Sequence, residues 1–191
     1  EAECQDPNSP ECQQCLAACK LNEMKSKTEI AVAVYAGGAW GAQTILTSNT
    51  ILDRSPRVAT AGNGTAMLTW VSNATNHEIG DPNNPNDIHY ATYDGSTWST
   101  PATVATGVPS VVKSALADKG TDAILLFTGD TDGNTQTPED RELYGVTYSA
   151  GSWGTVTRLT NDSSPAVEDA NPQVAYDNNG NPVMVWYRGG D

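Results

Sequence analysis

The residues of this sequence that are best suited to chemistry are the oxygen donors of one acidic segment. Asp130, Asp132 and Asn134 stand at alternate positions, and Glu139 and Asp140 follow shortly after them. Ca²⁺ takes oxygen ligands from carboxylates, amides and carbonyls, so these residues form a candidate calcium site. The segment is not an EF-hand loop, because its glycine stands too early. The alternative interpretation is an acidic loop that is simply solvated.

The cysteines form a second group, and all four fall in the first tenth of the chain: Cys4, Cys12, Cys15 and Cys19. Ser9 followed by Pro10 is typical of a helix start, and we predict a helix from about Pro10 to Lys25 with the last three cysteines along one stripe. A secreted acidic protein would hold these cysteines in two disulfides, whose pairing the sequence leaves open. A four-cysteine zinc site is the alternative, but only Cys12 and Cys15 form a close pair.

Nucleophilic and acid–base chemistry find little support in the sequence. The two histidines, His77 and His89, have no recognisable nucleophile partner, and no glycine-rich phosphate loop is present. With 23 acidic residues in the chain, no pair of carboxylates stands out as a glycosidase pair. We therefore predict that the chain is not an enzyme, with a glycosidase fragment as the alternative. Calcium is the one cofactor that the residues suggest.

Length and composition limit the classes of protein that fit. The 191 residues are about one domain's worth, and 17 glycines and 11 prolines beside 38% hydrophobic residues favour short strands and turns. A net charge of −13 makes nucleic acid and anionic membranes poor partners. No apolar run approaches the ~20 residues that a membrane-spanning helix needs. Together with the clustered cysteines, this composition predicts an extracellular or cell-surface protein.

A repeat organises most of the chain. In three segments an acidic residue, an aliphatic residue, a tyrosine and a tryptophan keep the same spacing, and another aliphatic residue follows after the tryptophan. These segments are Glu29–Tyr35 with Trp40 and Leu46, Asp87–Tyr93 with Trp98 and Val104, and Glu142–Tyr148 with Trp153 and Leu159. Between them a second pattern recurs, in which two short apolar runs flank a turn at Gly64, Gly120 or Gly180. Glycine and asparagine tolerate the positive φ of tight turns, so each pattern predicts a β-hairpin.

Two such hairpins make a unit of four strands, and repeated four-stranded antiparallel units are typical of β-propeller blades. When the glycine-turn hairpins are aligned with one another, Leu126 takes the position that Trp70 and Trp186 occupy in the other two. We interpret the recurring tryptophans as packing residues between sheets. The alternative is a platform of aromatic rings that binds carbohydrate.

The segment Tyr93-Asp94-Gly95, followed by Trp98, resembles the outer hairpins of sialidase-like and fungal fucose-lectin-like β-propellers. The resemblance covers roughly residues 28–191 and implies a propeller fold. It also implies particular binding residues: a sialidase would carry a cluster of arginines for its substrate carboxylate, and a fucose lectin an arginine and a glutamate at each site. Neither pattern repeats in this chain, and the first and third copies lack the aspartate of the turn.

The repeat divides the chain into a cysteine-containing helical segment, 1–27, and a partial propeller, 28–191. The propeller part is predicted to hold an outer hairpin, two whole blades and an inner hairpin, at 28–48, 55–106, 107–160 and 172–188. This all-β segment amounts to about three blade-equivalents, whereas propellers usually close with four to eight. The missing blades come either from the same parent chain or from a second copy that is joined head to tail.

These observations predict an extracellular, non-catalytic β-propeller segment that serves as a structural or recognition module of a larger surface protein or assembly. The alternative is a carbohydrate-binding lectin or a fragment of a sialidase-like glycosidase, for which a glycan would be the ligand. We expect neither a nucleic-acid partner nor a membrane span.

Overall fold

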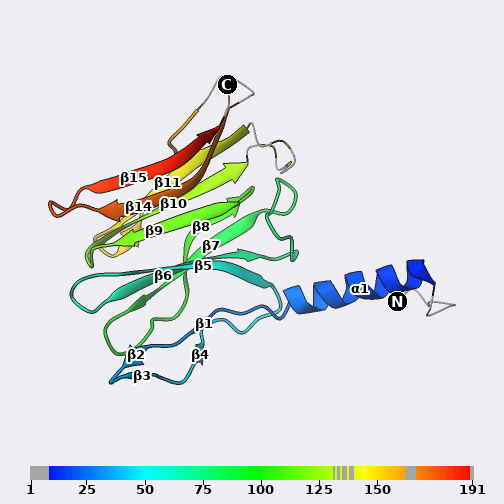
Figure 1. Cartoon of the computed structure of the whole chain (residues 1–191), viewed down its shortest axis with the longest axis horizontal. Helices are drawn as coiled ribbons and strands as arrows, with labels where there is room; N and C mark the ends of the chain where they lie inside the picture. Colours follow the sequence, from blue (N-terminus) through cyan, green and yellow to red (C-terminus); the bar gives the residue numbers. More distant parts are fainter. Residues whose placement is uncertain are drawn as a thin grey trace.

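The computed structural model describes residues 9–130, 132, 134, 137, 140–161 and 167–189. One helix, α1, precedes a series of antiparallel sheets that are stacked one on the next (Figure 1). The strands are β1 (Ala31–Val32), β2 (Tyr35–Ala36), β3 (Ala39–Trp40), β4 (Thr44–Ile45), β5 (Leu52–Thr60), β6 (Ala66–Asn73), β7 (Asn86–Tyr93), β8 (Ala102–Val108), β9 (Lys113–Asp118), β10 (Asp122–Asp130), β11 (Arg141–Ser149), β12 (Ser152–Trp153), β13 (Thr157–Arg158), β14 (Glu168–Tyr176) and β15 (Pro182–Gly189). The predicted all-β propeller segment, with a short cysteine-containing helix before it, is confirmed.

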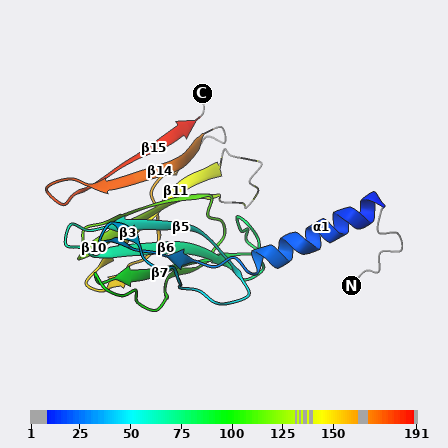
Figure 2. The same ribbon diagram turned by 60° about the horizontal axis from the view of Figure 1, so that its bottom comes forward.

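Helix α1 (Pro10–Lys25) begins and ends where the sequence predicts. Ser9 is its N-cap, and the Ser9 hydroxyl accepts a hydrogen bond from the Cys12 N–H at 3.1 Å. The helix projects away from the sheets (Figures 1 and 2), and Lys25 at its end pairs with Glu78 at 3.4 Å. In the part of the chain that the structure describes, no helix is long and apolar enough to cross a membrane.

The structure corrects the prediction of two disulfides. Cys12 is buried and disulfide-bonded, whereas Cys15 and Cys19 are exposed free thiols. Residues four apart on a helix have Cβ atoms about 5–6 Å apart, and a disulfide needs about 3.5–4.5 Å, so Cys15 and Cys19 are too far apart to bridge each other within α1. Cys4 lies outside the described residues, and the pairing of Cys12 therefore stays a prediction.

The first whole blade is the sheet β5–β6–β7–β8, in which the four strands follow each other in chain order. In the turn between β5 and β6, Gly64 has a φ of +86°, a left-handed backbone that glycine adopts without strain. Strand β6 is buried along its whole length. Its neighbours in the sheet flank its edges, and apolar clusters shared with the adjoining sheets cover its two faces.

The second whole blade is β9–β10–β11, with β12 and β13 both paired to β11. The pairing of its strands shows that the alignment of the second blade with the first, as made from the sequence, is wrong by one residue. Trp70 lies opposite His89 and Phe127 lies opposite Tyr144, which is the repeat equivalent of His89. Phe127, not Leu126, therefore takes the place of Trp70. The alignment slipped because two residues separate Gly120 from Ala123 on β10, whereas only one separates Gly64 from Ala66, the equivalent residue on β6.

Two half-blades lie at opposite ends of the stack (Figure 1). At one end β1 pairs with β4 and β2 pairs with β3; at the other end β14 pairs with β15. These short sheets lie where the sequence predicts an outer hairpin and an inner hairpin.

The core lies between neighbouring sheets. Ile30, Leu68, Trp70 and Ala91 form one cluster between the first half-blade and the first whole blade, with Leu46 and Trp98 packed against it. A second cluster joins the two whole blades, with Val104 and Trp153 packed against it. Each tryptophan thus packs near the aliphatic residue that follows the tryptophan of the preceding sheet. Trp98 and Trp153 are packing residues, as predicted.

Candidate functional site

The first strands of the blades, β5, β9 and β14, lie side by side along the inner side of the stack. Strands β5 and β14 each contain a β-bulge, where the register shifts between Arg54 and Arg57 and between Ala170 and Gln173. Within the bulges Ser55 and Asn171 have φ of +55° and +53°. A bulge bends its strand and re-aims the side chains beside it, and here it precedes Arg57 and Gln173.

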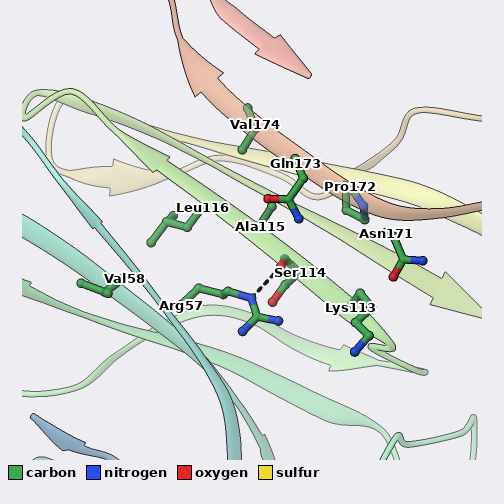
Figure 3. A pocket seen from close by; sticks show the side chains of 10 residues that line it. All are labelled: Arg57, Val58, Lys113, Ser114, Ala115, Leu116, Asn171, Pro172, Gln173 and Val174. Carbon is green, nitrogen blue, oxygen red and sulfur yellow. Dashed lines mark hydrogen bonds between the residues drawn. The ribbon is translucent and has the colours of Figure 1, made fainter. Parts of the chain in front are cut away.

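A pocket of about 360 Å³ lies between these three strands (Figure 3). Polar side chains from each strand line it: Arg57 from β5, Lys113 from β9, and Asn171 and Gln173 from β14. Figure 3 shows Arg57 and Gln173 approaching β9 from opposite sides, with Lys113 on β9 itself. We call this the axial pocket, because the innermost strands of the blades form it.

The axial pocket is electropositive although the chain is strongly acidic. Arg57 is fixed by two backbone carbonyls, since its Nε donates to Ser114 O at 2.7 Å and its Nη1 donates to Pro56 O at 3.0 Å. Arg57 and Lys113 form no ion pair with the described acidic residues. No carboxylate belongs to the described lining. Two cationic groups therefore face one space together with two side-chain amides.

This arrangement suits the binding of an anion with further polar groups. A guanidinium and an ammonium attract a carboxylate, sulfate or phosphate, and amide groups both donate and accept hydrogen bonds. The described lining contains neither a carboxylate nor a histidine.

Two acid–indole pairs link the first and second strands of their sheets. Trp70 Nε1 donates to Asp53 Oδ1 at 3.2 Å, and Trp186 Nε1 donates to Asp169 Oδ1 at 2.7 Å. Each aspartate immediately precedes a bulge, and each pair ties β5 to β6 or β14 to β15. Neither the two pairs nor the pocket was predicted from the sequence. The sequence does contain a repeated motif that marks both aspartates and both bulges, Asp-x-(Ser/Asn)-Pro-x-Val-Ala, at 53–59 and 169–175.

The structure brings together three of the five predicted calcium ligands. Carboxylate oxygens of Asp130, Asp132 and Asp140 lie within 4.8 Å of one another, and the Asp132 N–H donates to Asp140 Oδ2 at 3.1 Å. Asn134 contacts this cluster through its backbone, whose N–H donates to Asp132 Oδ1 at 2.6 Å. Glu139 lies outside the described residues.

A cation of the protein itself lies against this acidic cluster. The Arg141 Nε stands 3.6 Å from Asp130 Oδ2, and its Nη1 stands 2.9 Å from Glu168 Oε1. Arg141 therefore offsets part of the negative charge of Asp130, which is buried. Calcium binding at this loop stays a prediction.

The histidines take part in local structure. His89 stacks on Trp70, with ring centroids 5.7 Å apart, and His77 Nδ1 accepts a hydrogen bond from the Gly80 N–H at 2.9 Å. His77 Nε2 also lies 3.7 Å from Asp81 Oδ2, and His89 Nδ1 lies 3.5 Å from the Thr103 hydroxyl, at the limit of a hydrogen bond.

Comparison with known proteins supports the fold. No protein family matches the chain, and no curated protein matches it. Among solved structures, an alpha-L-arabinanase of Penicillium chrysogenum, complexed with arabinobiose, matches at 13% identity with a TM-score of 0.53, over 85% of this chain and 50% of that chain. A sialidase of Trypanosoma rangeli, in complex with the inhibitor DANA, matches at 13% identity with a TM-score of 0.44, over 87% of this chain and 31% of that chain.

The likeness to the arabinanase supports the class of fold. The chain is a segment of a β-propeller, and it spans about half the length of the arabinanase that it matches. At this level of identity the likeness shows the fold.

Proposed function

We propose that this propeller segment is a recognition module that binds an acidic carbohydrate in the axial pocket. The observation that carries the proposal is the convergence of Arg57 and Lys113 on one pocket without a carboxylate, in a chain whose net charge is −13. Elsewhere the chain would repel an anionic ligand over long range. A local cationic pocket in such a chain is therefore best explained by an anionic ligand.

The class of ligand follows from the groups in the pocket. The Arg57 guanidinium is held by backbone carbonyls at 2.7 and 3.0 Å, which leaves its Nη2 edge for a carboxylate. Asn171 and Gln173 offer amides of the kind that bind sugar hydroxyl groups. The arabinanase with a similar fold was solved with a disaccharide, arabinobiose, which supports a carbohydrate as the ligand.

We propose binding without hydrolysis. Glycosidases use two carboxylates that flank the scissile bond, and the described lining of the axial pocket has none. A glycosidase fragment remains the second candidate, because the chain matches about half of an arabinanase and further blades of a longer chain would bring further residues. An extracellular location, as the composition predicts, fits a carbohydrate ligand.

Titration calorimetry with a matched pair of sugars tests this proposal. We expect D-glucuronate to bind and D-glucose to bind at least about tenfold more weakly, because only the acid meets Arg57 and Lys113. Lys113→Gln should weaken glucuronate binding, whereas Lys20→Gln, which removes an exposed lysine of α1, should leave it unchanged. Equal binding of the two sugars, or equal effects of the two variants, would overturn the proposal.

A second assay separates binding from hydrolysis. Incubation with oligosaccharides of arabinose and of glucuronic acid is expected to release no reducing sugar. Release that survives in Lys113→Gln but is lost on replacing a carboxylate would favour the glycosidase candidate instead.

A further inference from the structure

The terminal half-blades expose positions that are buried in the whole blades. On β15, Val185 and Tyr187 are 62% and 57% exposed. By strand register, Val185 and Tyr187 are equivalent to Thr69 and Val71 on β6. Thr69 and Val71 are only 2% exposed. The difference arises because β6 pairs with β7 on its second edge, whereas among the described strands β15 pairs with β14 alone. The free edge and faces of β15 thus match a surface that is covered elsewhere in the fold.

The contacts between sheets are also left incomplete at both ends, in complementary ways. Leu46 and Trp98 pack into one inter-sheet cluster, and Val104 and Trp153 pack into the next. Leu159 is the third such aliphatic residue and is 44% exposed, while Trp40 is the third such tryptophan and is 71% exposed. One end of the stack therefore lacks a tryptophan and the other end lacks an aliphatic residue.

The register of the whole blades predicts how the two free ends would pair. The second and third strands place Ser72 opposite Asp87 and Gly129 opposite Glu142. If β15 paired with the first half-blade in the same register, Arg188 of β15 would lie opposite Glu29, which precedes β1. These two residues carry opposite charges, and opposite charges at facing positions stabilise a strand pair. Within the described residues Glu29 Oε2 is buried without a hydrogen-bond partner.

Side-chain size matches along the same register. Leu68 faces Ala91 in the first blade. In the same register, Met184 of β15 would lie opposite Ala33. Trp186 would face Ala31 in the same way. Large side chains of β15 thus meet alanines of the first half-blade, which a pleated sheet packs without overlap.

We propose that a second copy of this chain covers both ends. Strand β15 of each copy pairs with β1 and β2 of its partner, so that the inner hairpin of one copy and the outer hairpin of the other form a whole blade. Trp40 of one copy then packs near Leu159 of the other. Within the chain, Trp98 packs in the same way near Leu46, and Trp153 near Val104. Because each copy holds about three blade-equivalents, two copies close a ring of about six, within the usual range of propellers.

Light scattering after size-exclusion chromatography tests the proposal on the purified chain. We expect twice the chain mass of 20.2 kDa at micromolar concentration. Trp40→Ala and Leu159→Asp should each weaken the dimer at least about tenfold. Met24→Ala, which truncates a similarly exposed apolar residue on α1, should leave the mass unchanged. Circular dichroism of each variant shows whether its sheets are intact. A folded monomer of the unmodified chain, or an assembly of another size, would overturn the proposal.

Mixing the two variants tests the head-to-tail geometry. Each variant alone carries one damaged surface, so its own dimer has two damaged interfaces. A mixed pair keeps one intact interface, in which Trp40 of one chain meets Leu159 of the other. We expect the mixture to regain dimer mass. If the mixture stays monomeric, like the separate variants, the two surfaces do not meet and the geometry is wrong.

Discussion

The indole of Trp70 donates a hydrogen bond to the carboxylate of Asp53 at 3.2 Å, and both side chains are buried. The Ser72 hydroxyl donates to the same carboxylate oxygen. Trp186 and Asp169 repeat this relationship in the last hairpin, with Arg188 beside the aspartate at 3.2 Å. A buried carboxylate therefore links the first two strands just before the bulge that shapes the axial pocket.

Loss of the Asp53 carboxylate is predicted to destabilise the first blade. Asp53→Ala leaves the Trp70 N–H and the Ser72 hydroxyl buried without their acceptor, which costs about 2–4 kcal/mol of unfolding free energy. Asp53→Asn keeps an acceptor oxygen in place and should cost less. Urea unfolding followed by tryptophan fluorescence measures both values. A cost for Asp53→Ala below that of Asp53→Asn would show that the hydrogen bonds do not stabilise the fold.

The sequence predicted those elements that local signals define. Ser9 and Pro10 predict the start of α1, and the recurring tyrosine and tryptophan predict the outer hairpins. The packing role of Trp98 and Trp153 also followed, because a large apolar residue that recurs once per sheet needs a neighbouring sheet to bury it. These predictions succeed because each depends on neighbouring residues or on a strict period.

The candidate site was harder to predict because its residues are distant in sequence. Arg57, Lys113 and Gln173 meet only when three inner strands come together, and the bulges decide where two of these side chains point. The alignment of the second blade slipped by one residue for a related reason. One more residue between Gly120 and Ala123 than between Gly64 and Ala66 moves Phe127 into the tryptophan position, and no local pattern records that shift.

Glycine at position 80 is predicted to be essential for the loop between β6 and β7. Gly80 has a φ of +90°, and an added Cβ would stand 2.1 Å from Asn86 Nδ2 and 2.7 Å from Pro109 O. Gly80→Ala should therefore lower the unfolding free energy by about 1–2 kcal/mol for the left-handed backbone and by about 1–3 kcal/mol more for overpacking.

Gly62→Ala is the matched control, because Gly62 has no positive φ and an added Cβ there would have nothing within 4 Å. A change of at most about 0.5 kcal/mol is expected for this exposed turn. Thermal and urea unfolding of the two variants give the comparison. Equal effects of the two substitutions would contradict the steric argument.

Turn aspartates are predicted to make the protein sensitive to acid. Hydrogen bonds lower the pKa of three turn aspartates, chiefly from the Asn84 side chain to Asp81, from the Thr97 backbone to Asp94, and from the Asn181 backbone to Asp177. A lowered pKa in the folded state contributes stability that is present above the ordinary aspartate pKa and is lost as the pH falls through the folded value. Stability should therefore decline as the pH falls below about 4.

Asp118 provides the internal contrast. Burial raises the pKa of Asp118, although the Gly120 backbone N–H opposes the shift. Its contribution has the opposite sign, since it is present below the ordinary pKa and is lost as the pH rises through the folded value. Carboxyl carbon shifts measured by NMR across about pH 2 to 6 should show Asp118 titrating at higher pH than Asp94. The reverse order would contradict the assignment.

Calcium removal tests the acidic cluster of Asp130, Asp132 and Asp140. If these carboxylates hold Ca²⁺, the ion binds the folded state alone, and the thermal midpoint should be higher in millimolar calcium than in EDTA. Asp132→Asn removes one charged ligand and should shrink this difference, whereas Asp94→Asn changes an exposed turn aspartate away from the cluster and should not. Arg141 competes for the charge of Asp130 at 3.6 Å, so we expect a modest shift that grows in Arg141→Gln. Midpoints that are the same in calcium, magnesium and EDTA for all three variants would show that the loop is a solvated acidic segment whose charge Arg141 offsets.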